Sequence, residues 1–301
     1  MSKSKQPILS MGATGSIADS LTFRRSRGVN VAESKPKLPY SLTLAQQYQR
    51  WLYQDYAYLW TQQSAATKAI YAAKAARHHT TPIAEWLRYY LTNLPDIAAG
   101  WHLDNQTGST TPDWSRNSCT ATIYGPTYTP GRIAGARYCD GVDDYFTAPC
   151  SWSATEYFTF ELFYTPAAGY GDHAASILIG KGNPALRINK NTGKFFFRVY
   201  NHLTAEFNVI DSAPLTVGVT YHLAGLIDAT DNKLKLYKNG ALSATGDTFT
   251  GTLIDSTSYN LDFGGVPSGE RQPKGTIDEI RVTTRPLDAT ELLRHALRRY
   301  P

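Results

Sequence analysis

Hydrophobic spacing divides the chain into parts that follow different patterns. Between residues 43 and 94, apolar side chains recur at every third or fourth position, which is the spacing of one helix face. We expect residues 42–95 to form a small helical bundle that needs a further surface to pack on. A start signal precedes each of three predicted helices: Thr43 with Gln46 as a capping box, Ser64 as an N-cap, and Thr81 followed by Pro82.

From about residue 97 the pattern changes to short alternating runs separated by turns, which predicts strands. Asn239-Gly240 predicts a tight hairpin, because this pair tolerates the positive φ angles of such a turn. Many strands without helices between them indicate an antiparallel sandwich or jelly roll. The clearest runs are YFTFELFYT (157–165), ASILIGKG (175–182), GKFFFRVYNH (193–202), TYHLAGLIDA (220–229), KLKLYKNG (233–240), YNLDFGG (259–265) and GTIDEIRVT (275–283).

Residues 1–41 fit neither pattern and predict an extended arm. The stretch is rich in Gly, Ser, Lys and Arg, and Pro36 and Pro39 disfavour a helix. Left alone, such a segment is expected to be disordered, so we expect other subunits of an assembly to hold it. Two apolar pairs offer short strands to a partner surface: Leu21 with Phe23, and Val29 with Val31.

Charge is unevenly distributed along the chain. The 301 residues carry +5 overall, but residues 1–95 hold 12 Lys and Arg against 4 Asp and Glu, whereas residues 96–301 hold 18 against 21. The basic character therefore belongs to the N-terminal third. No run approaches the roughly 18 apolar residues of a membrane span, and the first residues lack the apolar region of a signal peptide. We expect neither a membrane span nor export by a signal peptide.

Three cysteines, Cys119, Cys139 and Cys150, are too few and too irregularly spaced for a disulfide framework, and they form no metal-binding spacing. One bridge within the trio is an open alternative. We expect three free, partly buried thiols instead.

One acidic residue conflicts with the strand pattern. In the run 275–283, alternation places Asp278 on the same face as Ile280 and Val282, toward a core. A buried carboxylate is costly unless it is paired, hydrogen-bonded or bound to a metal. Asp278 is therefore either a metal ligand or an acceptor for neighbouring backbone N–H groups.

The strand-rich part contains, in order, AGWHLDNQTGSTTPDWS (99–115), GARYCDGVDDYFTAP (135–149), VTYHLAGLIDATDNKLKLYKNGAL (219–242) and GTIDEIRVTTRPLDATELL (275–293). Together these stretches, spanning about residues 97–298, resemble the laminin G-like, concanavalin A-like jelly-roll family. The resemblance implies two curved antiparallel sheets. The expected fold is mainly β: an antiparallel concanavalin A-like jelly-roll sandwich over 96–301, preceded by the extended arm 1–41 and the helical bundle 42–95.

Members of this family often carry one calcium ion at the rim, near a DG turn and the closing acidic strand. The resemblance implies a calcium site in which backbone carbonyls complete the oxygen ligands. Cys139 stands where the family usually has an aromatic residue. The alternative is that Asp278 accepts backbone N–H groups and that two of the other acids only form a turn. The implied ligands are Asp140, Asp143, Asp144 and Asp278.

The same fold hosts glycosidases, which need two carboxylates on one face, about 5 Å apart in retaining enzymes. Glu156 and Glu161 are five residues apart and fall on opposite faces of a strand. Asp278 and Glu279 are adjacent and also point in opposite directions. We therefore expect no hydrolase.

A lectin role needs aromatic platforms combined with a few polar groups. Tyr and Trp at strand ends are more often half-buried packing residues, and the fold alone does not establish a sugar site. The candidate glycan-binding residues, all in or near predicted loops, are Trp114, Trp152, Tyr170, His173, Tyr200 and His202.

The N-terminal third contains GSIADSLTFRRSRGVNVAESKPKLP (15–39), TLAQQYQRWLYQDYAYLW (43–60) and WLRYYLTNLP (86–95). These stretches resemble a module of bacteriophage virion proteins. Arginine pairs with carboxylates in bidentate geometry, so we expect the arm to anchor on neighbouring protein subunits. Nucleic acid is a less favoured partner, because no aromatic residues for base stacking are interleaved. The expected anchoring residues are Phe23, Arg24, Arg25 and Arg27.

These features predict a structural virion protein of a tailed bacteriophage, either a capsid decoration or a tail-associated protein. The arm and bundle would attach it to the major capsid or tail protein, as a homo-oligomer. The jelly roll would bind host-surface glycans, with avidity from multiple copies. The alternative is a non-viral carbohydrate-binding surface adhesin, and the missing export signal counts against it.

Overall fold

The computed structural model describes residues 15–17, 21–26, 29–34, 43–152, 157–171, 175–182, 184–254, 258–268 and 271–298. By compactness the chain divides into the units Met1–Gln47 and Tyr48–Pro301. In the first unit, β1 (Gly15–Ile17), β2 (Leu21–Ser26) and β3 (Val29–Ser34) form an antiparallel sheet in that order. The short strands of the arm therefore pair with one another. Of the expected anchoring residues, Phe23, Arg24 and Arg25 lie on β2, whereas Arg27 lies outside the described residues.

The three predicted helices are confirmed as α1 (Leu44–Gln62), α2 (Ala65–His78) and α3 (Pro82–Asn93). The capping box at α1 is reciprocal, since the Thr43 N–H donates to Gln46 Oε1 (2.9 Å) and the Gln46 N–H to Thr43 Oγ1 (3.3 Å). Aromatic residues join the helices, and the buried Trp86 indole donates to the Tyr56 carbonyl (3.1 Å).

Two eight-stranded antiparallel sheets form the sandwich. The first sheet has the order β17 (Ala241–Thr248), β16 (Lys233–Lys238), β15 (Tyr221–Ile227), β10 (Thr159–Gly171), β19 (Pro273–Thr283), β8 (Gly135–Asp140) and β7 (Thr127–Pro130), with β4 (Ile97–Trp101) also paired to β19. The second sheet has the order β14 (Glu206–Ile210), β13 (Phe195–Tyr200), β12 (Ala185–Ile188), β11 (Ser176–Lys181), β18 (Leu261–Phe263), β9 (Tyr145–Ala148), β6 (Ala121–Tyr124) and β5 (Thr110–Thr111).

The core lies between these sheets and consists of their alternate, inward-facing side chains. Phe160 on β10, Phe197 on β13 and Phe263 on β18 are fully buried there. Asn239 (φ 53°) and Gly240 (φ 81°) form the predicted tight turn between β16 and β17. The mainly β jelly-roll prediction is confirmed.

Cysteine pairing differs from the expectation of three free thiols. Cys119 and Cys150 form a disulfide, with their Cα atoms 5.0 Å apart, and Cys139 is free and buried. The two bonded cysteines are 31 residues apart in sequence. Spacing alone carried no signal for this pair, because folding of the sandwich brings the two segments together.

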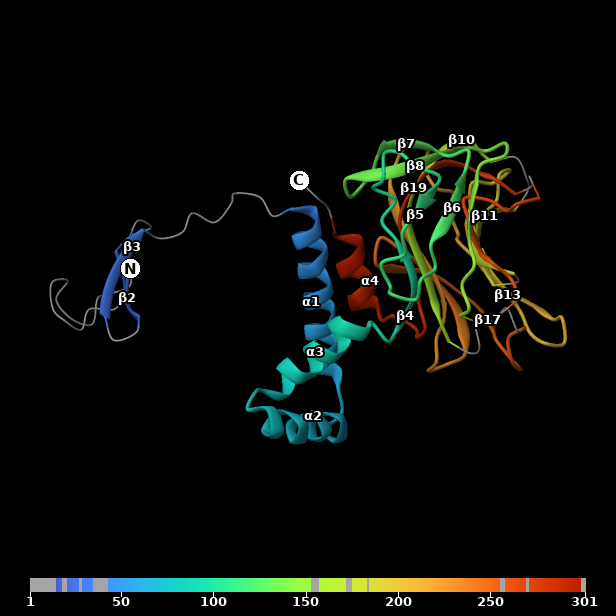
Figure 1. Cartoon of the computed structure of the whole chain (residues 1–301). Helices are drawn as coiled ribbons and strands as arrows, with labels where there is room; N and C mark the ends of the chain where they lie inside the picture. The colour runs from blue at the N-terminus through green and yellow to red at the C-terminus, as the bar shows by residue number, and fades with distance from the viewer. Residues whose placement is uncertain are drawn as a thin grey trace. The chain divides into compact units, whose positions relative to one another are not determined.

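Helix α1 lies beside the sandwich, and α2 lies farther from it (Figure 1). The short C-terminal helix α4 (Ala289–Ala296) contacts β15 and β17, and α1 lies beside it. Within the described part of the chain, no helix is long and apolar enough to cross a membrane.

Candidate functional site

A buried charged layer joins the helices to the first sheet. Glu161 on β10 accepts hydrogen bonds from His222 Nε2 (3.1 Å) and His295 Nδ1 (2.9 Å), and it pairs with Arg281 (3.3 Å). Burial raises the pKa of Glu161, but His295 and Arg281 outweigh it and hold the pKa well below its ordinary value. On the helical side, Asp55 of α1 pairs with His295 (3.3 Å). The carboxylates of this layer are matched by cations, so the layer acts as structural attachment.

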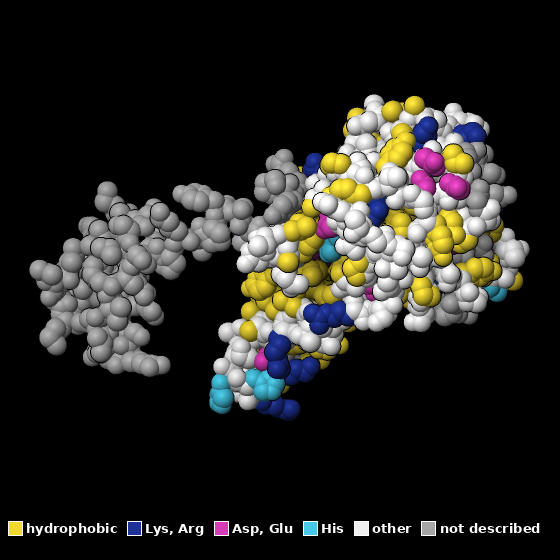
Figure 2. All heavy atoms as spheres, turned by 45° about the horizontal axis from the view of Figure 1, so that its top comes forward, with side chains coloured by type: hydrophobic (Ala, Val, Ile, Leu, Met, Phe, Trp, Pro, Cys, Tyr) yellow, Lys and Arg dark blue, Asp and Glu magenta, His cyan; other side chains and the backbone are white. Residues whose placement is uncertain are grey.

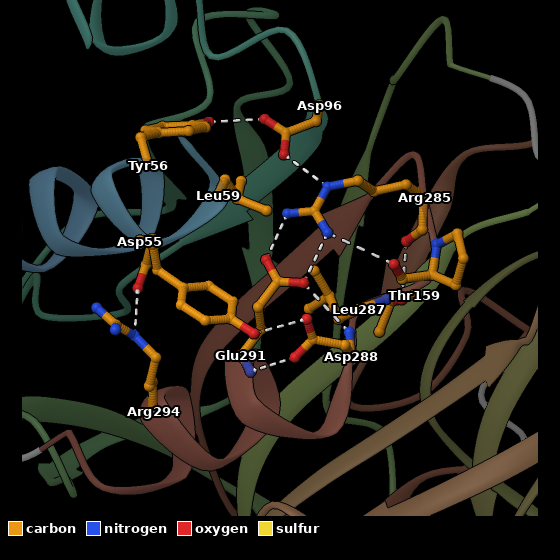
Figure 3. A network of polar contacts seen from close by, with 12 residues as sticks. Asp55, Tyr56, Leu59, Asp96, Thr159, Arg285, Leu287, Asp288, Glu291 and Arg294 are labelled. Atoms are coloured by element: carbon orange, nitrogen blue, oxygen red, sulfur yellow. Dashed lines mark hydrogen bonds and ion pairs between the residues drawn. The ribbon is translucent and has the colours of Figure 1, made fainter. Parts of the chain in front are cut away.

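A second network continues this attachment at the start of α4 (Figure 3). Arg285 donates to both oxygens of Glu291 (2.8 and 2.6 Å) and to Asp96 (3.0 Å), and Asp96 accepts the Tyr56 hydroxyl of α1 (2.7 Å). Asp288 caps α4 in a capping box with Glu291. The two networks therefore join α1 and α4 to this face of the first sheet.

A β-bulge determines where Asp278 points. Glu161 of β10 pairs with Arg281, whereas Phe163 pairs with Asp278, so β19 contains one extra residue. Glu279, with φ 50°, is the irregular position. Strict alternation therefore fails here, and the expected shared face of Asp278 with Ile280 and Val282 was wrong.

Asp278 accepts backbone N–H groups rather than joining the acidic rim. Its Oδ2 accepts the N–H groups of Arg132 (2.7 Å) and Ile133 (3.0 Å). Burial, then the charge of Glu279, raises the pKa of Asp278 well above its ordinary value. Asp278 lies outside the group that Asp140, Asp143 and Asp144 form, and its backbone contacts satisfy only Oδ2, since Oδ1 is buried without a hydrogen-bond partner.

The other three implied calcium ligands do come together. One carboxylate oxygen from each of Asp140, Asp143 and Asp144, at the β8–β9 turn, lies within 4.8 Å of the others. Burial and the charges of Asp140 and Asp143 raise the pKa of Asp144. Hard oxygen donors in a mutually repelling group fit a cation such as calcium.

The candidate glycan-binding residues fall into two groups. Trp114, Trp152 and Tyr170 are half-buried packing residues: Trp114 stacks on His102 beneath the helices, Trp152 packs against Phe158, and Tyr170 donates its hydroxyl to the Leu215 carbonyl (2.8 Å). His202 lies in the turn after β13, within 3.1 Å of Thr252, and Tyr200 lies on the outer face of the second sheet. His173 lies outside the described residues.

The outer face of the second sheet presents residues that the sequence analysis missed. Tyr124 and Tyr145 lie opposite each other on β6 and β9, with stacked rings 4.5 Å apart, and Tyr124 is 45% exposed. Thr147 follows on the same face and pairs with Asp262 of β18. Alternation around the buried Phe146 was the available signal, because it places Tyr145 and Thr147 outward.

Asp262 provides the acidic group of this surface. Burial raises its pKa to about 6, against opposing effects of Thr147 and Lys181. Its Oδ1 is buried and has no hydrogen-bond partner. We call Tyr124, Tyr145, Thr147 and Asp262 the tyrosine site. A stacked aromatic pair beside an unsatisfied carboxylate oxygen can bind a ligand that has both an apolar face and hydroxyl groups.

A family comparison agrees with this architecture. The family model Laminin_G_3, described as the concanavalin A-like lectin/glucanases superfamily, matches residues 140–293. The chain belongs to this family, and the resemblance identified from the sequence is confirmed. Comparison with curated proteins finds no matching sequence.

Solved structures share the fold at low identity. The binding domain of Paraclostridial Mosquitocidal Protein 1 matches with a TM-score of 0.54 and 14% identity over 67% of this chain and 52% of that chain. Domain 4 of AbnA, a GH43 extracellular arabinanase from Geobacillus stearothermophilus in complex with arabinotriose, matches at 0.53 and 18% over 67% and 98%. The botulinum neurotoxin type G receptor binding domain matches at 0.51 and 13% over 67% and 51%. The chain thus spans about half the length of the two toxin domains.

Proposed function

We propose that the jelly roll is a glycan-binding module and that the tyrosine site holds the sugar. The observation that carries this proposal is the unpartnered Asp262 Oδ1 beside the Tyr124–Tyr145 stack. Sugars offer an apolar ring face to aromatic residues and hydroxyl donors to a carboxylate. The arabinotriose complex of the arabinanase domain lends support at the level of the fold.

Binding without hydrolysis is part of the proposal. The residues paired with Asp262 on the neighbouring strands are Thr147 and Gly180. Neither supplies the second carboxylate of a glycosidase pair. We expect no release of reducing sugar from any glycan that binds.

Titration with arabinotriose and a panel of neutral oligosaccharides tests the tyrosine site. We expect Tyr124→Ala and Asp262→Asn each to weaken binding by about tenfold, a loss of roughly 1.4 kcal/mol. Tyr53→Ala on α1, which removes a similarly exposed ring, is the matched control and should bind like the unaltered chain. Equal affinity in all three variants would place the sugar elsewhere, and an absence of binding across the panel would refute the module.

A calcium ion at Asp140, Asp143 and Asp144 belongs to the same proposal. It would relieve the repulsion among three carboxylates beside Tyr145 and fix the β8–β9 turn. We expect calcium to raise the unfolding temperature of the chain, and Asp143→Asn, at an exposed position, to reduce that shift. An identical shift in the variant would exclude this group as the site.

The biological setting that we propose is the virion of a tailed bacteriophage. The N-terminal unit, with Phe23, Arg24, Arg25 and Arg27, would anchor the chain to major capsid or tail subunits as a homo-oligomer. Two features support an anchoring role at this end: the basic balance of residues 1–95 and the cationic side chains gathered over α2 (Figure 2). These side chains are Lys68, Lys74 and Arg77.

Co-sedimentation with the native particle tests the anchoring. We expect the full chain to sediment with the particle and a chain lacking residues 1–41 to remain in solution. Removal of the three arm arginines by glutamine substitution should weaken the association in the same direction. Association that is unchanged without the arm would refute the proposed anchor, and a chain that never binds a particle would favour an independent adhesin.

A further inference from the structure

A cluster of arginines lies on the same outer face as the tyrosine site. Arg198 of β13 is opposite Ala185 of β12, and Arg187 is two residues farther along β12, so the two arginines are diagonal neighbours. Arg271 is close enough to Arg187 for its charge to lower the pKa of Arg187. Tyr200 and Glu206 border the cluster, and the Tyr200 hydroxyl donates to Glu206.

These arginines have more donors than their protein partners satisfy. Arg187 is only 3% exposed, and its Nε and Nη1 atoms have no hydrogen-bond partner; Arg198 Nε is also buried and unpartnered. Burial, followed by the charges of Arg198 and Arg271, lowers the pKa of Arg187 to about 9. Glu206, 3.4 Å from Arg198, is the one carboxylate paired with the cluster among the described residues.

Such an arrangement is costly without a ligand. A buried guanidinium with unpaired N–H groups loses its hydration and receives no compensation. Two neighbouring cations add repulsion. A bound anion would satisfy the free donors and reduce the repulsion at once, and arginine suits planar or branched oxyanions because its donors form a fixed fork.

We propose that Arg187, Arg198 and Arg271 form a subsite for the carboxylate or sulfate group of an acidic glycan. This inference rests on the proposed glycan-binding function and specifies its substrate class. Arg198, whose side chain is 22% exposed, gives the ligand access to the more deeply buried Arg187.

The subsite and the tyrosine site can serve one ligand. Paired positions run across the sheet from Asp262 to Gly180, Ala185 and Arg198, one on each of four adjacent strands. Strands are about 4.8 Å apart, so Asp262 and Arg198 are separated by about 14 Å. An oligosaccharide of about three units that contacts Asp262 can therefore place an acidic group among the arginines, and a longer one can also reach the tyrosines on β9 and β6.

The test compares charged with neutral probes on the full chain. The probes are trigalacturonate for the carboxylate, a sulfated carrageenan tetrasaccharide for the sulfate, neutral arabinotriose, and inorganic sulfate alone. We expect the acidic probes to bind at least about tenfold more tightly than arabinotriose at low salt, and this preference to shrink as sodium chloride is added. Whichever acidic probe binds more tightly identifies the group that the subsite takes.

Arg187→Met and Arg198→Gln should both abolish the preference and leave arabinotriose affinity unchanged. Arg187→Met should also raise the unfolding temperature of the ligand-free chain, because it removes an unpaired buried cation. Arg50→Gln, on an exposed position of α1, removes the same charge and should keep the preference.

The outcomes separate this inference from the proposed function. Equal binding of acidic and neutral probes, or a preference that survives in both arginine variants, would overturn the subsite and leave glycan binding intact. If no glycan binds, the proposed function fails, and the binding of inorganic sulfate becomes the test of the anion subsite. Stabilisation by sulfate that depends on Arg187 would support an anion site, and its absence would overturn it.

Discussion

Asp262 is held in surroundings that make its charged form unfavourable. Its carboxyl has one unpartnered buried oxygen, and burial raises its pKa to about 6. The charged form is therefore less favourable in the folded chain than in the unfolded chain, where the carboxyl has a pKa near 3.9. A ligand hydroxyl that donates to Oδ1 would recover part of this cost.

The pH dependence of stability follows from that shift. Because the folded-state pKa is raised, the contribution of Asp262 is most favourable below about pH 4 and is lost as the pH rises through 6. The change in the free energy of unfolding that Asp262→Asn causes should therefore be more favourable at pH 7.5 than at pH 4, by about 1–2 kcal/mol. Urea unfolding of both chains at the two pH values measures this difference, and a variant effect that is the same at both would contradict it.

Asp278 leads to a different prediction because one of its oxygens accepts two backbone N–H groups, although its Oδ1, like that of Asp262, is buried without a hydrogen-bond partner. Oδ2 accepts two backbone N–H groups, and the raised pKa favours the protonated acid. Asp278→Asn keeps an acceptor and should change stability by less than about 1 kcal/mol, whereas Asp278→Ala leaves both N–H groups unsatisfied and should cost about 2–3 kcal/mol. Urea unfolding with and without calcium checks this, and a loss of calcium stabilisation in the Asn variant would return Asp278 to the metal site.

Residue-scale prediction from sequence succeeded where the signal was local. Asp140, Asp143 and Asp144 are close in sequence, and the structure brings them together. Asp278 was misplaced because the bulge at Glu279 reverses the alternation, and nothing within the run 275–283 marks an extra residue. Arg187 and Asp262 were missed because their importance depends on partners in other strands.

At the scale of elements, α4 depends on a cap that also serves as an attachment. Asp288 Oδ1 accepts the Glu291 N–H (2.8 Å) (Figure 3). Asp288 Oδ2 accepts the Tyr58 hydroxyl of α1 (3.0 Å). Glu291 in turn holds Arg285. Asp288 and Glu291 therefore connect the start of α4 to α1 and to the segment that follows β19.

Removal of this cap should be measurable. Asp288→Ala leaves the Glu291 N–H without its acceptor and should lower the free energy of unfolding by about 1–2 kcal/mol. Tyr58→Phe removes only the partly exposed hydroxyl contact and should cost no more than about 0.5 kcal/mol. Chemical denaturation of the two variants gives both numbers. Equal losses would show that the contact between helices, and not the cap, stabilises this region.

The helices themselves were predictable, and their location was not. Thr43 with Gln46, Ser64, and Thr81 with Pro82 specify helix starts through contacts within one turn. The surface that the bundle packs on is specified by pairs such as Asp55 with His295, which are far apart in sequence and carry no periodic signal. The disulfide between Cys119 and Cys150 escaped prediction for the same reason.

At the scale of the whole molecule, the charged layer makes the helices and the sandwich of residues 48–301 interdependent. Glu161 of β10 meets His222 of β15, Arg281 of β19 and His295 of α4, and Asp55 of α1 pairs with the same His295. A buried charge that loses its partner is strongly destabilising. Removal of the helices would therefore leave cations of this layer without Asp55 and expose the first sheet.

We expect residues 48–301 to unfold as one cooperative unit. Tryptophan fluorescence reports on the helices through Trp51, Trp60 and Trp86, together with the tryptophans of the sandwich. It should change at the same denaturant concentration as the strand signal in circular dichroism. Glu161→Gln should shift both signals together and cost about 3–5 kcal/mol, because His295 and Arg281 lose their buried carboxylate. Asp231→Asn, in the more exposed pair with Lys235, is the control and should cost at most about 1 kcal/mol.

Low pH should destabilise the same buried charged layer. The pKa values of Glu161 and Asp55 are lowered in the folded chain, so their stabilisation is present above the unfolded pKa near 4 and is lost as the pH falls below it. The lowered pKa of the buried His222 adds to this loss below about pH 6.5, because the unfolded chain takes up the proton more readily. Between pH 7 and pH 4 the fluorescence and dichroism transitions should therefore move together to lower denaturant concentration. A helical transition that separates from the sandwich transition in acid would show that the two parts are joined loosely, and would contradict the expectation that the bundle needs the sandwich to pack on.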